Sequence, residues 1–357
     1  MTWGYFKASA GIAGAFLLLT QPAAAQSAGR TIQQEAINRV VQTIIQSVRD
    51  QVHDRKLVAP SGPLGFAAGE SEFDSRNPFA TQDIPISFSA LAYAKAPPAA
   101  PGSSWLYGAN LTGADDESKT AGISTSIATT TGAFDVTKIG VFTMSDTLTF
   151  IASGSNAWSH QHGPFSIDNT TPSVSGTLSY SNSGFSVDFT SFVSWTRSTF
   201  QTAPAIVVNG NLLGYTANTQ YRFDLPSAVF IEPTIGMTYT EGYTANFGTK
   251  VSDTTEVHGG ARVGATMPWM GYTVQPTLSA LVSRTVDSSA AGFPGPIVPA
   301  GVIGFQGSAR VTVIWTPNFS SFVEAHATGM TGPSVPTLGY NTTRTVGAQA
   351  GLRYSWN

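Results

Sequence analysis

The sequence predicts an all-β protein, a transmembrane antiparallel β-barrel of about 12 strands that follows one N-terminal α-helix and a Pro-rich linker. Three observations support this prediction. From Trp105 onward, apolar and polar side chains alternate in run after run. The polar positions of these runs carry Ser, Thr, Gly and Gln, with few of the Lys and Glu that a water-facing sandwich needs. Aromatic residues gather at the ends of the runs, where a membrane interface would lie.

The composition limits the classes of function. Only 11% of the 357 residues are Asp, Glu, Lys or Arg, and the net charge is −3. No basic surface therefore indicates a nucleic-acid partner. The chain contains no cysteine, which excludes disulfides and thiolate metal sites and suits an exported protein.

Residues 1–25 have the pattern of a secretory signal peptide. Lys7 precedes a short apolar run at residues 11–20, and Ala23 to Ala25 place small residues before a cleavage site at Gln26. We therefore expect export with removal of this segment. No run of about 18 apolar residues follows it, so no transmembrane helix is expected in the mature chain.

Two further segments are expected before the strands. Between Ile32 and Val52 apolar residues recur three and four positions apart, which predicts an amphipathic helix within residues 26–58. Residues 59–104 contain seven prolines and many small residues, typical of a Pro/Gly-rich linker or a short passenger remnant. The helix either plugs the barrel lumen or lies outside it, and its continuous apolar stripe favours the second arrangement.

Residues 105–357 are expected to form the barrel. The run from Trp105 to Leu111 and the run FSVDFTSFVSW at 185–195 each place apolar side chains on one face and polar side chains on the other. We expect strands of about nine to eleven residues, with apolar faces toward lipid and polar faces toward the lumen. Because every backbone group in a bilayer needs a partner within the protein, the last strand must pair with the first.

Aromatic residues at the strand ends are expected to lie at the membrane interfaces. The candidates are Trp105, Trp195, Trp315, Tyr354 and Trp356. We expect the penultimate Trp356 to matter for assembly.

Charged residues on the inward positions predict a polar network in the lumen. The candidates are Arg222, Asp224, Glu232, His258, Arg262, Arg310, Glu324, His326 and Arg353. The favoured interpretation is a structural network of ion pairs. The alternative is a charged lumen that grips a plug helix or selects solutes.

No pattern indicates catalysis or a cofactor. The chain lacks motifs such as GxSxG and HExxH, so we expect no enzyme activity, no catalytic residue and no cofactor. His160 and His162 offer two imidazoles in a stretch expected to be a turn, but no third metal ligand is evident. We expect a solvated loop there and no metal.

Several segments resemble the translocator β-barrel of autotransporters, the outer-membrane proteins of type V secretion. These segments are GAFDVTKIGVF (132–142), IEPTIGMTYTEG (231–242), GARVGATMPWMGYTVQPTLSALV (260–282), SSFVEAHATG (320–329) and GAQAGLRYSW (347–356). The resemblance covers roughly residues 105–357. It implies a barrel in the outer membrane of a Gram-negative bacterium that, with the barrel-assembly machinery, brings an N-terminal passenger to the cell surface.

The expected partners are therefore outer-membrane lipid and the assembly machinery, and the barrel is expected to be monomeric. Only residues 26–104 precede the expected barrel, so the passenger would be very short or vestigial. Two alternatives stay open. The protein could be a porin-like channel plugged by its N-terminal segment, or a surface adhesin that acts through extracellular loops.

Overall fold

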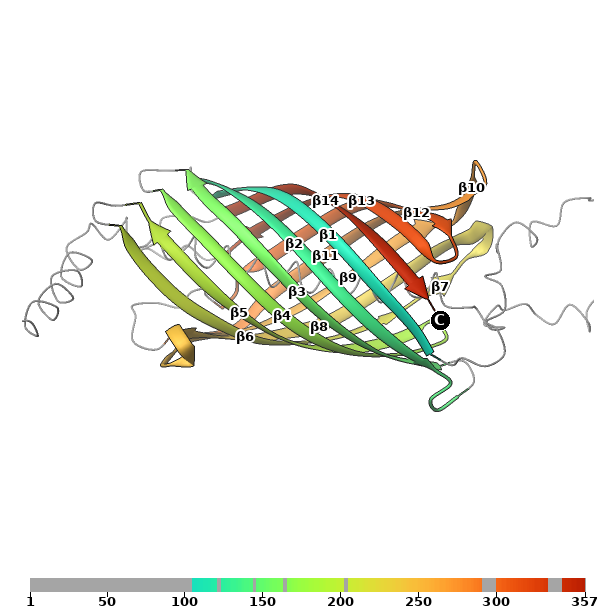
Figure 1. Ribbon diagram of the computed structural model, residues 1–357, viewed down its shortest axis with the longest axis horizontal. Coiled ribbons are helices and arrows are strands. Elements are labelled where there is room, and N and C mark those ends of the chain that lie inside the picture. Colours follow the sequence, from blue (N-terminus) through green and yellow to red (C-terminus); the bar gives the residue numbers. More distant parts are fainter. Residues whose placement is uncertain are drawn as a thin grey trace, which may run out of the picture.

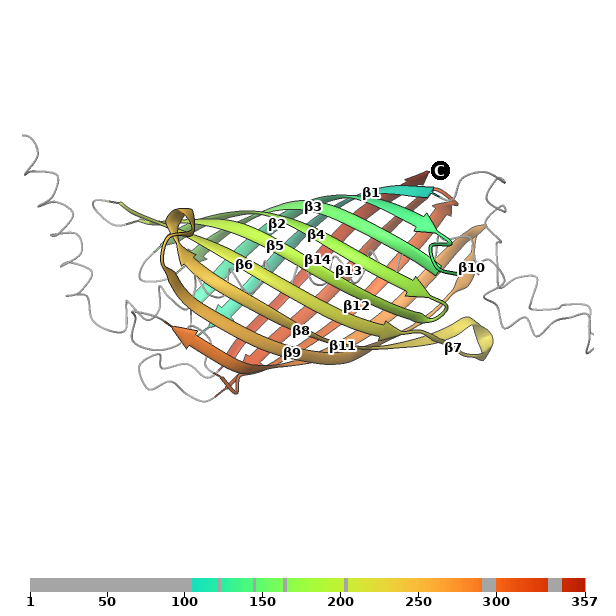
Figure 2. The same cartoon turned by 90° about the horizontal axis from the view of Figure 1, so that it is seen from below.

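The computed structural model describes residues 105–120, 123–143, 146–162, 166–201, 205–290, 300–332 and 342–356. The expected signal peptide, helix and linker lie outside these residues. Twelve long strands form the wall, and Figures 1 and 2 show them tilted around an elongated barrel. They are β1 (Trp105–Thr120), β2 (Ile123–Ile139), β3 (Asp146–His162), β4 (Ile167–Asn182), β5 (Phe185–Phe200), β6 (Ile206–Tyr221), β8 (Val229–Thr244), β9 (Lys250–Ala265), β11 (Tyr272–Ala290), β12 (Ile303–Thr316), β13 (Phe319–Thr331) and β14 (Thr342–Trp356). Two short strands, β7 (Phe223–Asp224) and β10 (Met267–Trp269), extend the wall at one end.

The sheet closes on itself, as the sequence predicts. Strand β14 pairs antiparallel with β1, and Leu352 lies opposite Leu111 in that register. Strand β9 pairs with both β8 and β11 and so completes the circle on the other side. Closure leaves no unpaired edge among the twelve long strands, which is the condition for a β-structure in lipid.

The strands are longer than expected. They contain 13 to 19 residues, whereas about nine to eleven suffice to cross a bilayer. In β1 the outward positions are apolar or small from Trp105 to Gly113, and then become Asp115, Glu117 and Lys119. The additional residues therefore continue the strand beyond the apolar band. There the outward positions are polar too, so the sequence no longer shows the alternation that indicates a strand.

The two faces of the wall have opposite chemistry. Outward side chains such as Ile235, Leu278 and Val323 are more than 60% exposed, whereas inward Thr177 and Ser186 are buried. A water-soluble protein shows the reverse distribution, because its apolar side chains gather inside. An apolar exterior and a polar interior are the pattern of a membrane barrel. Along the part of the chain that the structure describes, no helix is long and apolar enough to cross a bilayer.

The two ends of the barrel also differ. At one end, here the short-turn end, the connections include Ser183–Gly184 and Pro317–Asn318, and the chain terminus lies there (Figure 1). At the other, the loop end, the connections include residues 291–302 and 332–341. This asymmetry matches membrane barrels, whose periplasmic turns are short and whose extracellular loops are longer.

Outward aromatic rings gather at the short-turn end. The Trp356 ring lies 6.1 Å from those of Tyr107 and Phe134 and 5.8 Å from that of Tyr354. The Trp315 ring contacts Tyr272 at 4.9 Å between centroids, and Lys138 lies 5.0 Å from the Trp105 ring. Trp195 differs from the other interface candidates, because it lies on β5 five residues from the loop end.

Candidate functional site: a polar lumen with contacts that cross glycines

Most of the charged residues proposed for the lumen line the inner wall. Buried residues among them are Glu232, His258, Arg262, Arg310, Glu324 and Arg353, and the His326 side chain is 8% exposed. Arg222 and Asp224 are placed differently, beyond the end of β6. The Arg222 guanidinium lies 4.1 Å from the Phe230 ring centroid, and the Asp224 side chain is 65% exposed.

Arg353 on β14 forms an ion pair with Asp135 on β2, although β1 lies between them. The Arg353 Nη1 atom is 3.1 Å from Asp135 Oδ1. In the strand register Asp135 lies opposite Gly108 of β1, so the pair passes over a residue without a side chain. A Cβ atom at Gly108 would lie 2.6 Å from both carboxylate oxygens and 2.7 Å from Arg353 Nη2. Glycine at this position is therefore what lets the two side chains meet.

His326 on β13 contacts Asp116 on β1 in the same way, across β14. The His326 Nε2 atom is 2.6 Å from Asp116 Oδ1, and Gly347 lies opposite both residues. A Cβ atom at Gly347 would overlap the Asp116 carboxylate and lie 2.8 Å from the backbone oxygen of Asp115. This glycine cannot gain a side chain unless β14 moves away from β1.

A third contact of this type lies on the far side of the barrel. His258 on β9 donates from Nε2 to Asn218 Oδ1 on β6 at 2.6 Å. The Asn218 amide donates in turn to Asp188 Oδ2 on β5 at 2.7 Å. Gly236 on β8 lies between Asn218 and His258 and opposite both. A Cβ atom there would be 2.5 Å from His258 Nε2, so the relay again depends on a glycine.

Bulky inward side chains use neighbouring glycines too. The Phe322 ring lies over Gly351, and the Arg310 guanidinium lies 3.7 Å from the centroid of that ring. The Phe192 ring lies over Gly214 on the adjacent strand. Large inward side chains therefore pack over glycines of the neighbouring strand, where no side chain occupies the space.

Much of the remaining inner wall carries hydroxyl groups. Threonine pairs form hydrogen bonds between neighbouring strands, for example Thr177 with Thr190 at 2.8 Å and Thr216 with Thr238 at 3.1 Å. On β5 the hydroxyls of Ser186, Ser194 and Ser198 are buried and have no hydrogen-bond partner among the described residues. Because such groups are normally paired with protein or water, this part of the lumen is suited to hold water.

Charged contacts lie on both sides of the barrel. Arg262 on β9 and Glu232 on β8 are 3.6 Å apart. The Arg353–Asp135 ion pair and the His326–Asp116 contact cross a strand and join strands on either side of the β14–β1 closure. Buried charges are stable only when paired, and removing one partner typically costs about 3–5 kcal/mol. The two contacts that cross a strand therefore link the strands beside the closure.

Sequence reasoning named one partner of each contact and missed the other. Asp116, Asp135 and Asn218 have inward parity in their strands, so the alternation itself carried a signal for them. Their partners could not be assigned, because each contact skips a strand and depends on the register of two ladders.

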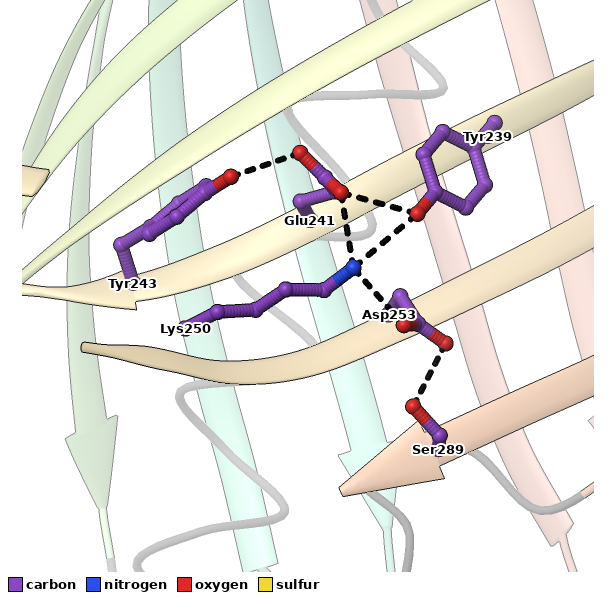
Figure 3. Close-up of polar contacts among 6 residues, drawn as sticks. All are labelled: Tyr239, Glu241, Tyr243, Lys250, Asp253 and Ser289. Carbon is purple, nitrogen blue, oxygen red and sulfur yellow. Dashed lines mark hydrogen bonds and ion pairs between the residues drawn. The ribbon is translucent and has the colours of Figure 1, made fainter. Parts of the chain in front are cut away.

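The outer wall carries a polar cluster at the loop end, shown in Figure 3. Lys250 Nζ lies 2.7 Å from Glu241 and 2.9 Å from Asp253. Hydroxyl groups complete the cluster: Tyr239 and Tyr243 donate to Glu241, and Ser289 donates to Asp253. Tyr239 and Glu241 share the outward parity of Ile235 and Met237, so this cluster marks the limit of the apolar band on the side of the loop end.

Comparison with known proteins identifies the fold. No protein-family model and no curated protein matches the sequence. Among solved structures, the β domain of the Bordetella autotransporter BrkA is similar, with 12% identity over 70% of this chain and 98% of that chain, and a TM-score of 0.51. The transport unit of the autotransporter AIDA-I from Escherichia coli shows 11% identity over 72% of this chain and 92% of that chain, and a TM-score of 0.51. The chain therefore has the closed barrel fold of autotransporter translocator domains.

Proposed function

We propose that this protein is an integral outer-membrane barrel of a Gram-negative bacterium, of the translocator type, with a very short or vestigial passenger in residues 26–104. The observation that carries the proposal is the combination of a closed twelve-stranded wall, an apolar exterior and a polar lumen. The fold shared with the BrkA and AIDA-I domains supports it. In this proposal the short turns face the periplasm and the loop end faces outward.

The luminal ion pairs have a structural role in this proposal. Arg353–Asp135 and His326–Asp116 connect strands across the closure, so in this proposal they fix the closure of the barrel around a lumen lined with hydroxyl groups. The outward rings of Trp105, Trp315, Tyr354 and Trp356 would anchor the short-turn end at the inner interface, and Trp195 would lie nearer the outer one.

The test follows the N-terminal segment in intact cells that express the full chain. An epitope inserted at residue 90 should be reachable by antibody and external protease if the segment is brought to the surface. An epitope in the Ser183–Gly184 turn should stay protected, and one at residue 296 should be reachable. Heat-modifiable migration on gels confirms that each variant is folded.

Other outcomes would favour the alternatives. Protection of the epitope at residue 90, together with bilayer conductance that rises when residues 31–58 are deleted, would indicate a plugged porin-like channel. Loss of cell binding on deletion of residues 291–299, without any exposure of residue 90, would indicate an adhesin. Folding of residues 105–357 in water without detergent would contradict a membrane barrel altogether.

A further inference from the structure

His160 and His162 lie at the end of β3, and not in a turn as the sequence predicts. The strand continues past the apolar band, so these two residues are part of the ladder. Positions two apart on a strand face the same side. Both side chains point outward with Trp158, whereas Gln161 between them is buried against the interior. Their rings are neighbours, 4.5 Å apart between centroids at an angle of 71°.

A carboxylate on the adjacent strand fixes the His160 ring. Its Nδ1 atom is 2.5 Å from Asp168 Oδ1 on β4. The other carboxylate oxygen accepts a hydrogen bond of 2.6 Å from the Gln201 side chain, so Asp168 is held from both sides. An imidazole whose Nδ1 atom donates to a carboxylate presents its Nε2 lone pair to the outside. This is the arrangement that orients histidine ligands in metal sites.

The site is open to solvent, which leaves a cation room to enter. The side chains of His160 and Asp168 are 44% and 47% exposed. Glu117 lies on the same outward face of β1, and its carboxylate is 3.3 Å from Lys119 Nζ. Ser124, the β2 residue that lies opposite His162, is small and bonds to Glu117.

We propose that His160 and His162 form a surface chelate for a divalent transition-metal ion. Imidazole nitrogens suit Cu²⁺, Ni²⁺ and Zn²⁺, and Cu²⁺ should bind most tightly of the three. With metal–nitrogen bonds of about 2.0–2.1 Å, two tetrahedral ligand atoms are about 3.3 Å apart. Among the described residues no group of three or more His, Cys, Asp or Glu side chains is arranged for a metal, so water completes the coordination.

The experiment uses the full chain purified in detergent without a histidine tag. Calorimetric titration with Zn²⁺ and electron paramagnetic resonance with Cu²⁺ should show one ion per chain and nitrogen coupling from imidazole. His160→Gln and His162→Gln should each abolish this signal. Asp168→Asn should weaken binding about 10–100-fold, because it removes the group that orients His160. Two controls, His53→Gln and Arg197→Gln, should leave binding unchanged.

Heat-modifiable migration of each variant shows that the barrel is intact, so that loss of binding reports on the site. Three results would overturn the proposal: no metal uptake by the wild-type chain, full affinity in His162→Gln, or loss of binding in His53→Gln. Unchanged affinity in Asp168→Asn would overturn the positioning role assigned to that carboxylate.

Discussion

Replacing Gly347 by alanine tests whether the contact between β13 and β1 depends on the missing side chain. The new methyl group would occupy the space of the Asp116 carboxylate. It would also lie 2.8 Å from the backbone oxygen of Asp115, which cannot move unless β1 and β14 separate. We therefore expect the alanine variant to break the His326–Asp116 contact and to strain the closing ladder.

The magnitude follows from the burial of the two partners. Their side chains are only 8% and 4% exposed, so each would remain in the wall without its partner. Breaking a buried pair costs about 3–5 kcal/mol, and overpacking adds about 1–3 kcal/mol. Total stabilities of about 5–15 kcal/mol are usual for folded domains. The variant should therefore lose a large part of its stability.

The measurement is urea unfolding in lipid vesicles, followed by tryptophan fluorescence. Gly113→Ala is the matched control, because Gly113 lies on β1 and a Cβ atom there has no neighbour within 4 Å. The control should stay within about 0.5 kcal/mol of wild type. In an Asp116→Ala background the Gly347→Ala change should cost less, since both the pair and the overlapping carboxylate are already gone. Equal unfolding free energies for Gly347→Ala and Gly113→Ala would refute this reasoning.

Three more predictions concern other parts of the wall. Gly236→Ala should displace Asn218 and His258 and lower the unfolding free energy by about 1–3 kcal/mol, while Gly132→Ala, with open space around it, should not; equal effects would contradict the relay. Leu278→Arg, on the outward face of β11, should lower the unfolding free energy in vesicles by about 2–4 kcal/mol, and Val286→Arg, nearer the loop end, by about 0–1 kcal/mol. Equal losses in the two variants would show that Leu278 does not lie in the apolar band. Trp356→Ala removes ring contacts with Tyr107 and Tyr354, each about 0.5–1.5 kcal/mol, and should lower the fraction of heat-modifiable barrel; normal assembly would contradict the role given to this residue.

The sequence was most informative where one physical constraint acts on every residue of a segment. Contact with lipid on one side and a polar lumen on the other imposes a period of two, so the closed barrel and the inward facing of Arg353 could be predicted. The strand lengths could not, because above the apolar band Glu117 and Lys119 face water on an extended ladder and resemble loop residues.

Features that depend on the register between strands could not be predicted from the sequence. His160 and His162 were expected in a turn because the ladder near them carries polar residues on both faces, which removes the alternation signal. Asp135 is two strands away from Arg353 in space and 218 positions away in the chain. Nothing local in GAFDVTK indicates that distance. Glycine has no side chain and adds nothing to the alternation of apolar and polar residues. The sequence therefore did not indicate that side chains from other strands meet above Gly108 and Gly347.

The two contacts beside the closure also bear on the order of folding. They join residues 210 and 218 positions apart, among the most distant in the chain. Contacts of such high sequence separation form late, because loop-closure entropy must first be overcome. The His326–Asp116 and Arg353–Asp135 contacts therefore form only when β14 pairs with β1, so they stabilise the complete ring and contribute nothing to a sheet that has not yet closed.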